Sequence, residues 1–413
     1  MYKNRIFLFV SISLIFSTLA FSQNSSTNSP YTRFGLGSIS DNANGARQAL
    51  GGTSIGFRSS KEINTVNPAS YSAVDSLSFM FDVGLSGMYS HFSDKNGKVG
   101  KLNGNLEYIT LQFPVTHFLG ISAGVLPYSF SGYAFSNITK LQINSDTIKA
   151  TETYNGSGTV SQIYLGMAGK FLKHFSAGIN AYYMFGNISN QRTVTYSPAN
   201  YNLTSQDNRI SVNAFRLRYG LQYFNTINGK HDISVGVFYE NKKKMHNTLY
   251  NKYNISQVAD TISNNEFFDL PQTFGIGAYY SINKRLTAGV DFSFQQWQNA
   301  NFFGKTDSLT NRWKASAGIE YIPNPGSYRY TDRLRYRIGL NISNSYYDIN
   351  GKSMPINLGI SAGLGIPMPK SNSILNASFE YGKIGNSSYM SENYFKLTVS
   401  ATINEFWFFK RKL

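Results

Sequence analysis

The sequence contains no cysteine among its 413 residues, which excludes disulfides, thiolate metal ligands, cysteine nucleophiles and lipidation at a processed N-terminal cysteine. It contains only five histidines, and three of them, His117, His174 and His231, fall where we expect short turns. No HExxH, GxSxG or phosphate-loop motif occurs, and no histidine–carboxylate group has the spacing of a metal site. We therefore expect no catalytic residues, no metal and no cofactor: this protein is not an enzyme.

Long apolar runs are also missing, except at the start of the chain. Lys3 and Arg5 precede an apolar run over residues 6–19, and Ala20-Phe21-Ser22 places small residues three and one before a cut. This pattern predicts a signal peptide over 1–22 and a mature protein that starts at Gln23. The run is shorter than the roughly 20 residues of a spanning helix, which argues against a retained anchor.

Without a second apolar run, the chain is not a helical inner-membrane protein. Its mean hydropathy is only −0.27, yet 15% of its residues are aromatic and 36 are glycine. Transmembrane β-barrels have this composition because only alternate residues of a strand face lipid. We therefore expect a protein of the cell outer membrane of a Gram-negative bacterium.

The charge balance is basic. The net charge of +16 becomes +14 without Lys3 and Arg5, with 36 basic against 22 acidic residues. A secreted barrel rarely meets nucleic acid, so the expected partners of this charge are outer-membrane lipid headgroups and lipopolysaccharide phosphates. The alternative is that the excess consists of solvated lysines in loops.

From Leu77 onward the chain alternates with a period of two. Leu358, Ile360 and Leu364, for example, alternate with Gly359 and Ser361. One face of such a strand is apolar and the other small or polar, and a membrane barrel turns the apolar face to lipid. The fold class predicted is all-β, a 14-stranded antiparallel transmembrane β-barrel. Its segments are 77-90, 104-115, 118-129, 159-171, 174-187, 209-224, 231-242, 270-281, 285-297, 311-322, 333-344, 355-368, 372-382 and 394-408.

The connections between these segments alternate in length. Those after even-numbered segments are mostly tight, such as Thr116-His117 and Leu172-Lys173. Those after odd-numbered segments are longer, and we expect them to be outer loops at 91-103, 130-158, 188-208, 243-269 and 298-310. Barrels have short periplasmic turns and long outer loops, so both chain ends lie on the periplasmic side in this interpretation.

Residues 23-76 do not alternate. They are rich in glycine and carry phenylalanine, leucine and isoleucine, which argues against pure disorder. Because the lumen of a barrel this wide is either filled or open, we predict that 23-76 forms a hatch that plugs the barrel built by 77-413. The alternative is a disordered periplasmic tail.

Several short motifs carry a family resemblance. Gly45-Ala46-Arg47, Gly51-Gly52-Thr53-Ser54-Ile55 and Asn67-Pro68-Ala69-Ser70 resemble the hatch of the FadL family of outer-membrane transporters. Leu270 to Ala278, followed by Arg285 to Asp291 and Trp297, resembles a hairpin of that family. The hatch motif residues are Gly51, Gly52, Asn67, Pro68 and Ala69. The Gln23 start and the Trp-Phe-Phe-Lys-Arg-Lys ending look like proteins of the Bacteroidetes.

The resemblance implies uptake of long-chain fatty acids or other hydrophobic small molecules. Ligand is captured by outer loops and leaves sideways through the barrel wall beside a kinked third strand. Gly120, Gly124 and Pro127 are the candidate kink residues, because proline breaks a strand ladder and glycine weakens it. Pro127 has the alternative interpretation of an ordinary residue at the strand's outer end. Tyr133 and Phe135, in the expected loop 130-158, are the candidate ligand contacts.

The chain departs from that pattern in two places. The first outer loop is polar, which is poor for capturing an acyl chain. The predicted inward faces carry many charges, and buried charges need partners. A second hypothesis is therefore a non-transporting barrel that is a scaffold or partner of other envelope proteins in an outer-membrane secretion or assembly complex. A general porin is disfavoured because the hatch closes the lumen. The inward charges are Asp82, Glu240, Asp291, Lys314, Glu320, Arg335, Arg337, Glu380 and Lys396.

Overall fold

The computed structural model describes residues 26–406 apart from 96, 144–145, 198–203, 256–257, 265–266, 302–308, 350–351, 354–355, 370 and 387–389. The predicted signal peptide (1–22), Gln23 and the predicted ending at 407–413 lie outside the described residues. No helix among the described residues is long and apolar enough to cross a membrane.

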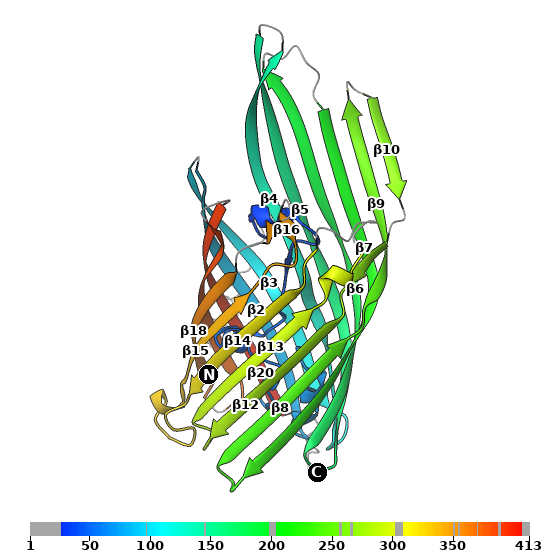
Figure 1. Cartoon of the computed structure of the whole chain (residues 1–413). Coiled ribbons are helices and arrows are strands. Elements are labelled where there is room, and N and C mark those ends of the chain that lie inside the picture. Colours follow the sequence, from blue (N-terminus) through cyan, green and yellow to red (C-terminus); the bar gives the residue numbers. More distant parts are fainter. Residues whose placement is uncertain are drawn as a thin grey trace, which may run out of the picture.

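Within the described part of the chain, 14 antiparallel strands close into one barrel (Figure 1). The ring closes where its first strand pairs with its last, from Ser78 opposite Phe406 to Ser93 opposite Ser391. In order around the ring the strands are β2 (Ser78–Ser93), β3 (Lys98–Pro114), β4 (Leu119–Ile143), β5 (Asp146–Phe171), β6 (Phe175–Ser197), β7 (Thr204–Ile227), β8 (His231–Glu240), β12 (Thr273–Ile282), β13 (Leu286–Gln295), β14 (Arg312–Tyr321), β15 (Arg335–Ser343), β18 (Asn357–Pro367), β19 (Ile374–Asn386) and β20 (Met390–Phe406).

Each of the 14 predicted segments overlaps one strand of this ring, so the predicted 14-stranded antiparallel barrel is confirmed. The alternation also holds in space. In β18 the side chains of Leu358, Ile360 and Leu364 are exposed on the outer wall, whereas Ser361 between them is buried. Apolar side chains thus cover the outside, and small or polar side chains face the interior.

The expected long outer loops are largely strand, which corrects the prediction. β4 and β5 extend through the expected loop 130-158, β6 and β7 extend into 188-208, and 243-269 contains three further strands. These are β9 (Lys243–Ile255), β10 (Val258–Asn264) and β11 (Phe267–Leu270), and β9 pairs with the outer part of β7. One side of the wall therefore rises well above the other in Figure 1.

Residues 26–76, here called the N-terminal segment, are irregular and mostly buried. They contain the 3-10 helices η1 (Pro30–Arg33) and η2 (Pro68–Ala73), the short strand β1 (Ser38–Ile39) and one helical turn, α2 (Gly45–Gln48). Leu36, Ala46, Ile63 and Tyr71 have no exposed side-chain surface. η2 packs against β4, β5, β6 and β7, and α2 packs against β18, β19 and β20. The segment therefore contacts opposite sides of the inner wall.

Candidate functional site

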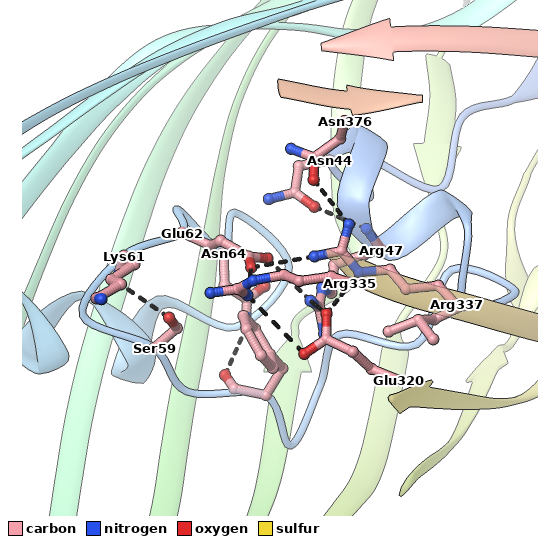
Figure 2. Close-up of polar contacts among 12 residues, drawn as sticks. Asn44, Arg47, Ser59, Lys61, Glu62, Asn64, Glu320, Arg335, Arg337 and Asn376 are labelled. Atoms are coloured by element: carbon pink, nitrogen blue, oxygen red, sulfur yellow. Dashed lines mark hydrogen bonds and ion pairs between the residues drawn. The ribbon is translucent and has the colours of Figure 1, made fainter. Parts of the chain in front are cut away.

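The inner wall and the N-terminal segment are joined by a buried group of charges, here called the ionic cluster: Arg47, Glu62, Glu320, Arg335 and Arg337 (Figure 2). Glu62 lies at its centre. Its two carboxylate oxygens lie 2.9 Å from Arg47 Nη2 and 2.7 Å from Arg335 Nη1. On the wall, Arg337 Nε donates to Glu320 at 2.6 Å.

Most of this cluster is shielded from solvent, and only Arg335 is partly exposed, at 18% of its side chain. The side chains of Glu62 and Arg337 have no exposed surface, and that of Arg47 has 2%. Burial alone would raise the pKa of Glu62, but the guanidinium groups of Arg47, Arg337 and Arg335 outweigh burial and hold this pKa below its usual value. Three arginines thus face two ionised carboxylates, and Arg337 Nη1 donates a further hydrogen bond to Asn376 at 2.7 Å.

Local backbone geometry brings Arg47 to this position. Asn44 caps α2 by accepting a hydrogen bond from Arg47 N at 2.9 Å, and the turn ends at two glycines with positive φ, Gly51 at 68° and Gly52 at 85°. A Cβ on Gly51 would lie 2.3 Å from the carbonyl oxygen of Leu340 in β15. Glycine at this position therefore allows the two backbones to touch, and α2 sits directly on the wall.

A second set of polar contacts holds the middle of the segment. Arg218 donates to the carbonyl oxygen of Val66 at 2.9 Å and also pairs with Glu240. Glu240 in turn pairs with Arg216 at 2.7 Å. On β13, the carboxylate of Asp291 accepts the backbone N–H of Ile55 at 2.7 Å. Wall charges thus satisfy backbone groups that an irregular buried segment would otherwise leave unpaired.

The predicted hatch motif residues lie at these wall contacts. Gly52 lies beside Lys314, and Gly51 N donates to Ser361 Oγ at 2.9 Å. Asn67 caps η2 and donates to the carbonyl oxygen of Ile55 at 2.8 Å. Pro68 packs on Gly178 and Gly220 of the wall, and the carbonyl oxygen of Ala69 accepts from Ser176 at 2.6 Å.

The predicted inward charges do face the interior, and most have partners. Lys314 pairs with Asp41 of the N-terminal segment at 2.6 Å, and Lys396 pairs with Glu107 at 2.8 Å. Glu380 accepts hydrogen bonds from Tyr394 and Asn341. Asp82 accepts one from Tyr108 at 3.3 Å, and it forms no ion pair with a cation among the described residues.

A cavity of about 260 Å³ lies between the N-terminal segment and the inner wall. Its lining is mixed, with Tyr31 and Ile39 beside many polar side chains. The charged residues that line it are Asp41, Glu107, Arg312, Lys314, Glu380, Glu392 and Lys396. Such a lining suits water or a polar solute better than an acyl chain, since charged groups lose solvation against an apolar ligand.

The wall has one short seam, between β3 and β4. These two strands pair only from Ile109 opposite Val125 to Pro114 opposite Gly120, although β3 continues along β2, and β4 along β5, far beyond. The register of β4 shifts between Pro127 and Ser129, just past the last pair. The candidate kink residues Gly120 and Gly124 lie within the paired part, and Pro127 lies where the ladder to β3 has ended.

The N-terminal segment spans this seam. On the β4 side, β1 pairs with Ser129 and Phe130, and Thr32 Oγ1 accepts the N–H of Gly132 at 3.0 Å. On the β3 side, Asn28 donates to Asn103 at 2.9 Å and Asn105 donates to the carbonyl oxygen of Ser26 at 2.8 Å. Residues 26–40 therefore take the place of β3 along this part of β4.

The expected loop position of Tyr133 and Phe135 is wrong, because both lie in strand β4. Tyr133 is buried and its hydroxyl donates to Asn190 at 2.7 Å. Phe135 stacks on Tyr154 with ring centroids 5.1 Å apart, and Arg33 lies over the same tyrosine ring at 4.2 Å. These rings pack on one another and on the N-terminal segment.

Sequence reasoning missed the half of the ionic cluster that the N-terminal segment supplies, Arg47 and Glu62, because an irregular segment has no period that assigns a face. It also missed Arg216 and Arg218, which an Arg-x-Arg pattern between outward aromatics in β7 would have indicated. Among the residues that the structure describes, no group of three or more His, Cys, Asp or Glu side chains has the geometry of a metal site.

Comparison with known proteins gives two findings. A family model described as BamG matches residues 1–413. Solved structures with a similar fold, each 12% identical in sequence, include the P. putida toluene transporter TodX, with a TM-score of 0.59 over 90% of this chain and 100% of that chain. The CymD monoaromatic hydrocarbon channel has a TM-score of 0.58 over 88% and 97%. A Pseudomonas aeruginosa FadL homologue has a TM-score of 0.58 over 87% and 98%.

At this identity the likeness to these channels shows a shared fold, and it agrees with the FadL-like barrel predicted from the sequence. No curated protein matches the chain.

Proposed function

This chain belongs to the BamG family, and from that membership and its firmly seated N-terminal segment we propose that it is a non-transporting outer-membrane barrel that acts as a scaffold or partner in an outer-membrane secretion or assembly complex. The apolar outer wall supports the membrane location. The N-terminal segment is the hatch that closes the lumen, and residues 1–22 are the signal peptide that directs the chain to the envelope.

The ionic cluster is the observation that carries this proposal. Removing the N-terminal segment would separate Arg47 and Glu62 from Arg335, Arg337 and Glu320, all of which are buried or nearly so. Breaking one buried ion pair by removing a partner costs about 3–5 kcal/mol, because a charge stays behind without solvent. A hatch held this way suits a closed barrel better than one that opens at each transport event.

The chemistry of the cavity supports the same proposal. A pocket for a hydrophobic compound is lined predominantly by apolar side chains with a few polar groups. Here four carboxylates and three cationic side chains line the cavity. The name of the family fits the partner hypothesis better than the transport hypothesis.

The test is the native mass of the tagged protein, extracted gently from its own membrane, with its components identified. We expect a stoichiometric complex with other envelope proteins, and we expect that deleting the gene disturbs export or assembly of outer-membrane proteins. A monomer that carries a fatty acid or another hydrophobic molecule would overturn this function.

The second candidate is uptake of hydrophobic compounds such as long-chain fatty acids, with lateral exit through the wall. The seam between β3 and β4 is the observation that favours it, because the wall there is completed by residues 26–40 instead of a strand ladder. Two of the proteins with a similar fold are named as a toluene transporter and a monoaromatic hydrocarbon channel.

Liposome uptake of a labelled fatty acid separates the two functions. If the chain transports, protein lacking residues Gln23 to Ser70 loses or deregulates uptake relative to the full mature chain. If neither protein admits fatty acid above protein-free liposomes, the transport candidate fails and the partner function stands.

A further inference from the structure

The end of the barrel that bears the short turns has one long connection. The β7–β8 and β12–β13 turns are tight, with positive φ at Asn228 (52°), Gly229 (67°), Asn283 (52°) and Lys284 (56°). Between β14 and β15, by contrast, strand pairing ends at Tyr321 opposite Tyr336, and residues 322–334 continue beyond it. This connection, here called the 322–334 loop, stands out as the gold loop at the lower left of Figure 1.

The 322–334 loop is ordered by its own hydrogen bonds. Asn324 N donates to the carbonyl oxygen of Asp332 at 2.8 Å, and Ser327 Oγ donates to the Asp332 carboxylate at 2.8 Å. The loop contains the 3-10 turn η4 (Thr331–Arg333), and Arg333 lies over the Tyr330 ring at 5.8 Å. A loop that is fixed before binding loses little conformational entropy when a partner docks.

The tip of this loop displays side chains that a folded protein normally covers. Tyr328 is fully exposed, Tyr330 is 41% exposed, and Arg329 between them is exposed. Tyrosine and arginine are the residue types that, with tryptophan, contribute most to binding at protein interfaces. Within the described part of the chain, the ring contact of Tyr330 is with Arg333 of the same loop and not with the barrel wall.

Neighbouring turns extend the loop into a basic surface. Ile322 N donates to the carbonyl oxygen of Arg285 at 2.7 Å, and Asn283 N donates to that of Lys230 at 2.7 Å, so three consecutive turns are joined. Two carboxylates lie in these turns, Asp232, which accepts a hydrogen bond from Thr226 at 2.6 Å, and Asp332, which accepts one from Ser327, and the cations outnumber them. The cations on this surface are Lys230, Lys284, Arg285, Arg329 and Arg333.

We propose that the 322–334 loop and the two turns beside it form the docking surface for an acidic region of a periplasmic protein. This inference rests on the proposed partner function and locates its contact. Charge complementarity selects an acidic partner, and the preformed tyrosine–arginine tip selects a folded protein surface over diffuse attraction. The outward rings of Tyr321 and Tyr336 already occupy the end of the lipid-facing wall, so the loop beyond them projects into the aqueous side.

The test places a photo-crosslinking amino acid at position 328 of the full chain in its own cell. A matched chain carries it at His117, an exposed residue in the β3–β4 turn at the same end of the barrel. We expect an adduct with one protein at 328 and none with that protein at 117. The crosslinked protein must also be a component of the purified native complex and must present an acidic surface.

Charge reversal at the loop tip sharpens the test. Arg329→Glu should lower the yield of the adduct at 328 about tenfold, as expected for loss of an interface arginine. Lys98→Glu, an equal change of charge at the opposite end of the barrel, should leave the yield unchanged. Heat-modified migration on gels checks that each variant folds.

Other outcomes overturn the inference. An adduct with lipid alone, equal adducts at 328 and 117, or no adduct while the native complex keeps its mass would show that this loop is not the docking surface, and the partner function would survive. A native mass equal to that of the monomer would instead remove the partner function itself.

Discussion

Among the regions where the N-terminal segment meets the barrel wall, two differ clearly in chemistry. At β14, β15 and β18 it is held by the buried ionic cluster and by direct contact of backbones at Gly51. At the seam between β3 and β4 it is held by neutral hydrogen bonds from short polar side chains, such as Thr32 to Gly132. A buried charge that loses its partner costs several times more than a neutral hydrogen bond, so one segment is firmly seated on one side and lightly on the other.

Neutralising the centre of the ionic cluster should give the largest effect. Glu62→Gln leaves Arg47, Arg335 and Arg337 with only Glu320, and we expect a loss of about 3–5 kcal/mol in the stability of the seated segment. Trypsin should then cleave the segment at its arginines while the barrel stays resistant. Glu152→Gln, at an exposed pair with Arg192, is the matched control and should cost less than about 1 kcal/mol. Equal sensitivity of the two variants would contradict a firm seat.

Lowering the pH should also destabilise the seated segment at the ionic cluster, by less than the Glu62→Gln substitution does. Because its three arginines hold the pKa of Glu62 below the usual value, the stability that it contributes is complete above the usual glutamate pKa. It is lost as the pH falls through the lowered pKa. Protease protection of the segment, measured from pH 7 to pH 3 with an acid-active protease, should decline in the wild type. A decline of the same size in Glu62→Gln would show that another group is responsible.

Adding a methyl group at the backbone contact should have an intermediate effect. Gly51→Ala places a Cβ 2.3 Å from the Leu340 carbonyl and keeps a positive φ, so a cost of about 1–3 kcal/mol is expected. Gly97→Ala meets nothing within 4 Å and is the control. Urea unfolding in detergent measures the free energy of unfolding of both variants. A neutral Gly51→Ala would mean that the segment shifts off β15 without penalty.

The smallest effect should come from the seam. Thr32→Val removes the hydroxyl that bonds to Gly132 and to the carbonyl oxygen of Ser29. We expect the stability of the seated segment to fall by about 1 kcal/mol. Hydrogen exchange should rise at residues 128–132 of β4, and the proteolysis pattern at the ionic cluster should not change. If exchange rises around Glu62 as well, the two regions are coupled and the distinction between them disappears.

Much of the barrel was readable from the sequence because each strand has one lipid face and one lumen face. Leu358, Ile360 and Leu364 reveal that asymmetry, and so do the inward charges Lys314 and Arg337. The sequence predicts a loop over the outer parts of β4 and β5 because both of their faces are largely polar. In β4, Asn137 and Thr139 lie on one face and Lys140 and Gln142 on the other, so both faces carry polar side chains and alternation gives little information about strand structure.

The seating of the N-terminal segment was predictable only in outline. The hatch motif residues do lie against the wall, but Glu62 gave no signal, because its partners Arg335 and Arg337 lie more than 250 residues away and no local spacing links them. The sequence offers Pro127 only as a candidate kink residue, and the closure of the seam by residues 26–40 depends on contacts between segments that the sequence does not bring together.

The ring closes between its first and last strands, β2 and β20, and this has a consequence for the order of assembly. The ring of strands is closed once Ser78 lies opposite Phe406, and the N-terminal segment lies inside it against both sides of the wall. A segment that packs against both sides of the wall is placed more easily before the wall closes than after. We therefore expect residues 26–76 to take their place while the wall is still an open sheet, before β20 pairs with β2 and encloses them.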